Sequence, residues 1–137
     1  MREPKDVMID GKPLEEILAS DRYNHARFNF SGADLSDVNL KGEWIQDANF
    51  EGANLSGADL RGAWLGGCNF KGADFTTANL EGVSFYWADL RGAIFAGANI
   101  TGADFTGAQI EGADLEVVEG ENEQKNIVRH KSQGKTI

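Results

Sequence analysis

The chain has 137 residues, one cysteine and a formal net charge of −9. This length supports one domain, and so acidic a composition excludes a direct grip on nucleic acid phosphates, which needs clustered Lys and Arg. The sequence shows neither a secretory signal peptide nor an apolar run long enough to span a membrane, so we expect a cytoplasmic protein that does not insert into membranes.

Residues 1–27 predict a short cap with a strand and a helix. The apolar run 7–9 can form a strand, and Asp10-Gly11 has the chemistry of a turn. Pro13 suits the first turn of a helix whose apolar residues share one face. These apolar residues are Leu14, Ile17 and Leu18. We expect this segment to cover the apolar end and the unpaired strand edge of the element that follows.

Residues 28–117 divide into eighteen units of five residues. Each unit has Phe, Leu or Ile at its centre and a small apolar residue, usually Ala, two positions earlier. The exceptions in the small column are Phe28, Val38, Glu43, Cys68 and Val83. The centres are Phe30, Leu35, Leu40, Ile45, Phe50, Leu55, Leu60, Leu65, Phe70, Phe75, Leu80, Phe85, Leu90, Phe95, Ile100, Phe105, Ile110 and Leu115. Both columns must point to one buried side, where Cys68 is expected to act as a small hydrophobe.

A period of five excludes a helix and a straight strand. On a helix the centres would advance by about 140° per unit, so they would be distributed around the whole helix and form no apolar face. On a straight strand an odd period would send successive centres to opposite faces. A corner in every unit keeps all centres inward, and glycine fills most positions two after the centre, where such corners need it. The pattern predicts an all-β solenoid of very short strands.

The runs ADLRGAWL, ANLSGADL and AGANITGADFTGA resemble the pentapeptide-repeat family. The resemblance implies a right-handed quadrilateral β-helix, in which four units make one square coil and residues twenty apart stack on one face. Eighteen units would then form about four and a half coils.

After Val117 the repeat stops, and residues 118–137 are expected to form a polar tail. The stretch 119–125 is rich in charge and is expected to be a mobile linker, whereas 127–131 could either return over the last coil or serve as a basic tail. No clear amphipathic helix follows the repeat. The last coil is therefore expected to offer an edge for a homodimer.

Catalytic, metal and cofactor chemistry is not indicated anywhere in the sequence. His25 and His130 lie outside the repeat, and neither has a Cys or acidic neighbour at metal-ligand spacing. No nucleophile elbow, phosphate-binding loop or dinucleotide fingerprint is present, since the repeat explains every Gly-rich run. We expect a protein that is not an enzyme and binds neither metal nor cofactor.

Four aromatic residues break the repeat on its outer side. Trp44 and Trp64 occupy the position before the centre, which usually holds Asp or Asn, and they are twenty residues apart. Tyr86 and Trp87 fall on the same face and its following corner. The four rings either pack against a terminal segment or form a continuous solvent-facing strip that binds a protein partner. We favour an interaction or scaffold module without a named partner.

The alternative function is an acidic DNA mimic. The repeat carries four basic and thirteen acidic residues, and some acidic members of the resembled family bind type II topoisomerases such as gyrase. Stacking at twenty residues would pair Glu51 with Lys71 and Arg91 with Glu111, and this pairing would neutralise part of one face. Aspartates that bind turn amides cannot all replace phosphates.

Overall fold

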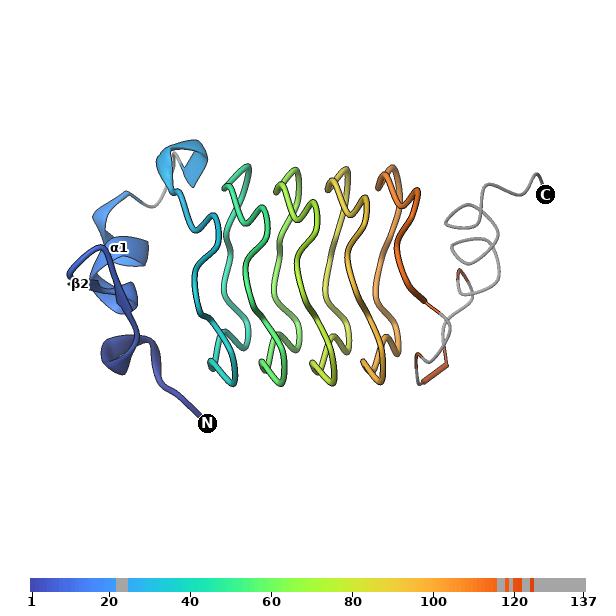
Figure 1. Ribbon diagram of the computed structural model, residues 1–137, viewed down its shortest axis with the longest axis horizontal. Coiled ribbons are helices and arrows are strands. Elements are labelled where there is room, and N and C mark those ends of the chain that lie inside the picture. The colour runs from blue at the N-terminus through green and yellow to red at the C-terminus, as the bar shows by residue number, and fades with distance from the viewer. Residues whose placement is uncertain (22–24, 116–117, 119, 122–123, 125–137) are drawn as a thin grey trace.

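The computed structural model describes residues 1–21, 25–115, 118, 120–121 and 124 (Figure 1). The predicted covering segment 127–131 and His130 lie outside these described residues. Figure 1 shows a row of stacked coils with the N-terminal elements lying across one end. None of the helices in the described ranges has the length and apolar character that a membrane crossing requires.

The N-terminal elements are η1 (Pro4–Asp6), β1 (Met8–Ile9), β2 (Lys12–Pro13), α1 (Leu14–Ser20) and η2 (His25–Arg27). Strands β1 and β2 pair antiparallel around a two-residue turn at Asp10 and Gly11, whose φ angles of 48° and 81° suit an Asp-Gly hairpin. Pro13 was expected in the first helical turn. It lies instead just before α1 with an extended ψ of 137°, where it ends β2.

Each repeat unit forms a one-residue strand followed by a corner. Parallel bridges join residues twenty apart without interruption, from Asn29 and Asn49 to Ile94 and Asp114. At Phe70 the backbone amide donates to the carbonyl of Asp89 at 2.7 Å, and the amide of Ala73 closes the corner on the carbonyl of Phe70 at 2.9 Å. Hydrogen bonds to the adjacent coils therefore stabilise each coil, and a hydrogen bond between residues three apart stabilises each corner.

Corners need a left-handed backbone, and glycine supplies it in most units. Gly72, for example, has a φ of 68°. Four units in 28–115 place another residue in this conformation, with φ between 54° and 59°. These residues are Asp37, Asp47, Thr77 and Trp87. A side chain in this region costs roughly 1–2 kcal/mol per residue, so these four positions are exceptions that require an explanation.

The core consists of the centre column and the small column. Every described centre is nearly or fully buried, and the rings form ladders across coils: Phe50 and Phe70 stack at 4.7 Å, and Phe75 and Phe95 stack at 5.1 Å. Cys68 is buried as expected, and burial raises the pKa of its thiol to about 12, so it stays protonated.

The N-terminal segment packs on the first coil through apolar and backbone contacts. Val7, Ile9 and Leu14 belong to the same buried cluster as the repeat core. Arg2 adds an outer strand: its amide donates to the carbonyl of Asp37 and its carbonyl accepts from the amide of Asn39, both at 2.7 Å. One strand edge of the first coil is thus paired rather than open.

The described residues after the repeat contact the last coil. The carbonyl of Glu121 accepts from the amide of Gly102 at 3.0 Å, and the side-chain oxygen Oε1 of Gln124 accepts from the amide of Phe105 at 2.7 Å. In the interior coils this second bond comes from a backbone carbonyl, as Asp104 provides for Phe85. A side chain therefore replaces the missing next coil at this position.

Candidate partner-binding face

The four aromatic residues singled out in the sequence lie side by side on one face. We call Trp44, Trp64, Tyr86 and Trp87 the aromatic strip. Their exposed fractions are 65%, 37%, 42% and 64%, respectively. Ring centroids follow one another at 6.0 Å from Trp44 to Trp64, 6.2 Å from Trp64 to Tyr86 and 6.2 Å from Tyr86 to Trp87. The structure brings all four together into one chain of ring contacts.

The coil geometry explains the order of the strip. Trp44 and Trp64 are bridge partners on adjacent coils, so their side chains leave the same face. The spacing of adjacent strands alone would put their rings about 5 Å apart. The centroids instead lie 6.0 Å apart and the planes are tilted by 54°. The exposed rings extend beyond the backbone ladder and are free to turn, whereas the strand spacing constrains only the backbone.

Glycines make room for two of the rings. A Cβ added at Gly66 would lie 2.9 Å from Nε1 of Trp64, and a Cβ added at Gly107 would lie 2.7 Å from Cδ2 of Trp87. Gly66 has no left-handed φ, so the ring of Trp64 is the feature that excludes a side chain there. The sequence carried a signal for this contact, because position 66 is the only glycine directly after a centre.

The face that carries the strip has acidic but no basic repeat residues. Asp47 and Asp104 belong to its units, which are centred at 45, 65, 85 and 105. The four basic residues of the repeat follow centres on the two neighbouring faces. They are Lys41, Arg61, Lys71 and Arg91. The aromatic strip therefore lies on an acidic face, and the two neighbouring faces carry the basic residues.

The predicted charge pairs between coils do not form direct ion pairs in the described residues, although Glu111 interacts electrostatically with Arg91. Arg91 pairs with Asp89 at 2.7 Å rather than with Glu111, and the described residues show no ion pair between Glu51 and Lys71. Residues two apart on a strand share a face, so an arginine reaches the aspartate of its own unit first. In both Arg91–Asp89 and the equivalent Arg61–Asp59 pair, the guanidinium holds the pKa of the carboxyl below its usual value.

Other aspartates bind their own corners. Asp34, Asp74 and Asp104 each accept a hydrogen bond from the backbone amide two residues later and a second from that residue's hydroxyl. These bonds lower the pKa of Asp34 and of Asp104. The carboxylates thus serve turn geometry, as expected for short polar side chains.

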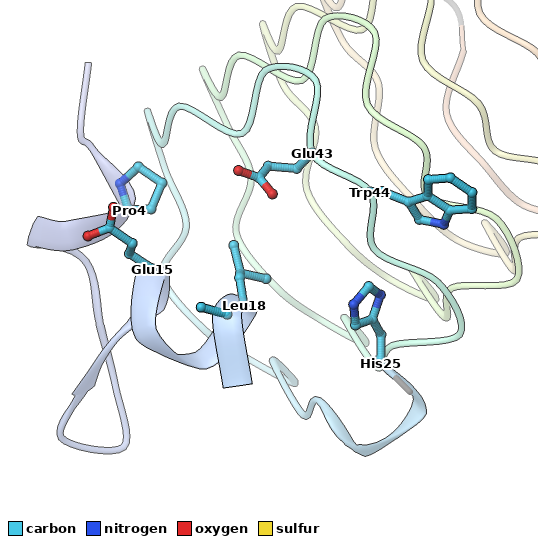
Figure 2. A pocket seen from close by; sticks show the side chains of 7 residues that line it. Pro4, Glu15, Leu18, His25, Glu43 and Trp44 are labelled. Carbon is cyan, nitrogen blue, oxygen red and sulfur yellow. The ribbon is translucent and has the colours of Figure 1, made fainter. Parts of the chain in front are cut away.

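A pocket of about 430 Å³ adjoins the strip at its N-terminal end (Figure 2). It lies between α1 and the first coil, and its lining residues are Pro4, Glu15, Leu18, Ala19, His25, Glu43 and Trp44. Trp44 therefore belongs both to the strip and to the pocket wall. Sequence reasoning missed this pocket, because the packing of the N-terminal segment creates it.

His25 replaces a missing turn acceptor beside this pocket. In most units the side chain before the centre accepts from the amide after it, as Asn39 does for Lys41 at 3.1 Å. Trp44 has no such acceptor, and Nδ1 of His25 accepts from the amide of Gln46 at 3.1 Å instead. The imidazole is buried and stacks on Phe28 at 5.1 Å. His25 is thus part of the first coil's structure, not an isolated residue outside it.

Metal binding has no donor set within residues 1–21, 25–115, 118, 120–121 and 124. No three His, Cys, Asp or Glu side chains of these residues gather closely enough to hold an ion. His25 lies near Glu43, but Glu43 makes no ion pair with it within this part of the chain.

The family model for pentapeptide repeats matches eight copies in overlapping segments at residues 24–52, 33–72, 45–82, 53–92 and 78–116. The chain belongs to the pentapeptide-repeat family. Membership makes the fold a right-handed quadrilateral β-helix, which confirms the predicted fold class at that level. No curated protein matches the chain.

Solved pentapeptide-repeat proteins resemble this chain to different degrees. A pentapeptide-repeat protein from the thylakoid lumen of Arabidopsis thaliana is 30% identical to this chain, with a TM-score of 0.71. The alignment covers 76% of this chain and 72% of the Arabidopsis chain. HetL, a protein of the cyanobacterium Nostoc involved in heterocyst differentiation regulation, is 31% identical, with a TM-score of 0.33. That alignment covers 66% of this chain and 48% of HetL. QnrB1, a plasmid-mediated fluoroquinolone resistance protein, is 22% identical with a TM-score of 0.35, covering 80% and 74%.

Proposed function

We propose that this pentapeptide-repeat protein is a non-enzymatic interaction module that binds a protein partner through its aromatic strip. The observation that carries the proposal is the unbroken series of exposed ring contacts from Trp44 to Trp87. Exposed apolar patches on soluble proteins mark interaction sites, and Trp and Tyr are the residue types that contribute most to binding at protein interfaces.

Two residues of the strip replace side chains that would stabilise the corners of the coil, and this supports a role in binding rather than in folding. Asn49 and Asn69 hold the amides two residues later at 2.9 and 3.0 Å, a bond that Trp44 and Trp64 cannot make. A solvated Asn or Asp at those two positions would serve the corner better than indole does. Two tryptophans one coil apart are therefore better explained by a covering partner than by the needs of the coil.

We further propose a domain organisation in which residues 28–117 form about four and a half coils. Residues 1–27 would act as the N-terminal cap. Burial of Val7, Ile9 and Leu14, together with the outer strand at Arg2, supports this cap. The cytoplasmic location stays a prediction, and the similar Arabidopsis protein comes from the thylakoid lumen.

An acidic DNA mimic that binds a type II topoisomerase such as gyrase is the alternative function. The net charge of the repeat supports it, because four basic residues stand against thirteen acidic ones. The hydrogen bonding gives it less support. Asp34, Asp74 and Asp104 bind turn donors, while Asp59 and Asp89 bind arginines, so fewer carboxylates are available to replace phosphates.

A pull-down with a matched control tests the strip. Trp64→Asp should abolish capture of the partner and leave the melting temperature nearly unchanged, because Asp supplies the turn acceptor that Trp64 lacks and so offsets the lost ring contacts with Trp44 and Tyr86. Ile94→Asp is the control, because Ile94 holds the same position in its unit on the opposite face and is 40% exposed. The captured protein is then purified and its affinity for each variant measured. Equal affinity for wild type and Trp64→Asp would refute the strip.

A gyrase supercoiling assay separates the two functions. A DNA mimic would inhibit supercoiling, and Trp64→Asp would retain that inhibition because the substitution adds a negative charge. An interaction module of the kind proposed would leave gyrase activity unchanged.

A further inference from the structure

The pocket beside Trp44 differs from the rest of the repeat in the residue that closes it. Glu43 occupies the inward small column, where most units have Ala. Figure 2 shows its carboxylate directed into the space between α1 and the coil, above Leu18. Nothing in the repeat pattern requires a carboxylate at this position.

Glu43 is half-buried and has no partner in the part of the chain that the structure describes. No hydrogen bond or ion pair involves its carboxylate, and burial raises its pKa. A partly desolvated, unpaired carboxylate is unfavourable for folding. Its presence in place of the usual alanine therefore suggests a role in binding.

His25 supplies a hydrogen-bond donor to the same pocket. Its Nδ1 accepts the amide of Gln46, so the proton of the neutral ring is on Nε2. Within the described residues Nε2 makes no hydrogen bond, and it is not a fully buried atom although the exposed fraction of the residue is only 8%, so Nε2 is reachable from the pocket. Figure 2 shows the imidazole between Trp44 and Leu18 with one nitrogen facing the pocket.

We propose that this pocket anchors a basic side chain, Lys or Arg, of the partner segment that lies along the aromatic strip. Glu43 would face the cation, Glu15 would add negative charge at the rim beside Pro4, the ring of Trp44 would contact the cation, and Nε2–H of His25 would donate to a backbone carbonyl of the partner. The proposal rests on the proposed function and names the chemistry of the partner.

The charge of the lining and the indole ring of Trp44 both favour a cationic side chain over other occupants of the pocket. The lining contains two carboxylates and no Lys or Arg, so it repels anions. Indole is the best aromatic surface for ammonium and guanidinium groups. A bare metal ion is less suitable, since the described residues hold no three-ligand group. The pocket adjoins the strip at Trp44, so one polypeptide segment can occupy both.

The test uses the full chain and a small probe that does not depend on knowing the partner. Nα-acetyl-L-arginine amide is titrated against ¹⁵N-labelled protein, with the uncharged isostere Nα-acetyl-L-citrulline amide as the control ligand. The arginine probe should shift the indole N–H of Trp44 and the amide of Gln46, and the citrulline probe should not. Equal binding of both probes, or shifts only elsewhere, would overturn the proposal.

Substitutions of Glu43 then test whether the guanidinium group of the arginine probe binds beside this carboxylate. Glu43→Ala, which restores the usual repeat residue, should weaken binding of the arginine probe about tenfold while raising the melting temperature. Glu43→Gln keeps the side-chain shape and should weaken binding similarly. Undiminished binding by both variants, or a lower melting temperature of Glu43→Ala, would refute a binding role for this carboxylate.

The same probe distinguishes this proposal from the function on which it rests. Trp64→Asp removes the centre of the strip but leaves the pocket lining intact, so it should bind the arginine probe like wild type. Loss of the partner by Trp64→Asp with unchanged probe binding by Glu43→Ala would sustain the strip and refute the anchor. The reverse pattern would sustain a cation pocket and refute the strip.

Discussion

The indole ring of Trp87 lies over the backbone of Gly107, one coil further along the chain. Trp87 has a left-handed φ of 57°, and Gly107 has a φ of 72°. The other three non-glycine corner residues in 28–115 show the same relationship, because each has its side chain over a glycine twenty residues later. The pairs are Asp37 with Gly57, Asp47 with Gly67 and Thr77 with Gly97.

Gly107→Ala should therefore destabilise the protein more than an ordinary corner substitution. A matched control is Gly72→Ala, since Gly72 has a φ of 68° and no atom within 4 Å of an added Cβ. Both changes should cost roughly 1–2 kcal/mol for the left-handed backbone. Gly107→Ala should cost about 1 kcal/mol more, because the ring of Trp87 must leave its rotamer. Urea denaturation measures both, and equal losses would refute the ring contact.

Phe70→Ala should be among the most damaging single core changes. Phe70 is fully buried and contacts the rings of Phe50 at 4.7 Å, Phe75 at 5.2 Å and Phe85 at 5.6 Å. The cavity should lower the free energy of unfolding by roughly 3–5 kcal/mol. Phe70→Leu, which keeps most of the volume, should lose much less. A Phe70→Ala protein with unchanged melting behaviour would remove Phe70 from the core.

Stability should fall at low pH because of the aspartates with lowered pKa. Asp34, Asp59, Asp89 and Asp104 have folded pKa values below the usual 3.8. Their contribution is present above that value and is lost as pH falls through the folded pKa. Asp34 is exposed and the other three are partly buried, but all four lie at the surface, where solvent screens their charge, so each contributes less than about 1 kcal/mol. Replacing the four by Asn, the residue that many other units use, should flatten the acid side of the stability curve.

Glu43 should have the opposite pH dependence. Its folded pKa is raised above the usual 4.5, so its carboxyl is most compatible with folding when protonated. That contribution is present below pH 4.5 and is lost as pH rises through the folded pKa. Chemical denaturation at a series of pH values should show that Glu43→Gln is more stable than wild type, and that the difference in the free energy of unfolding grows as the pH rises above 4.5. A constant gain at all pH values would contradict the raised pKa.

The tryptophans should differ in their access to solvent. Trp44 and Trp87 have 65% and 64% of their surface exposed, whereas Trp64 has 37% because Trp44 and Tyr86 flank it. Acrylamide quenching of three single-tryptophan variants should be strong for Trp44 and Trp87 and weaker for Trp64. A blue-shifted emission protected from quencher at all three positions would show that a terminal segment covers the strip and would refute a free binding face.

The repeat was the part of the fold that the sequence predicted well. The inward columns, the corner glycines and the pairing of Trp44 with Trp64 on one face follow from a strict five-residue period, because each unit imposes the same geometry on the next. The closest ion pairs were not predicted, since an arginine reaches the aspartate two residues earlier in its own unit before it reaches the glutamate of another coil.

The pocket and its residues could not be predicted for a different reason. The position of His25 depends on how the N-terminal segment crosses the first coil, a packing event without a periodic signal. Glu43 was visible as an exception in the small column, but only the structure shows which space its carboxylate enters. The predicted C-terminal homodimer also stays a prediction, although Glu121 and Gln124 already occupy two amides at that end.

Stacking at intervals of twenty residues means that chain length determines which way the aromatic face points. Duplicating a whole coil would lengthen the column and leave Trp44, Trp64 and Trp87 in line. Inserting a single unit between Trp64 and Tyr86 would instead rotate everything beyond the insertion by a quarter turn, and the strip would be divided between two adjacent sides without a change in any of its residues. An evolving or engineered variant of this protein can therefore gain or lose a binding face through small in-frame insertions alone.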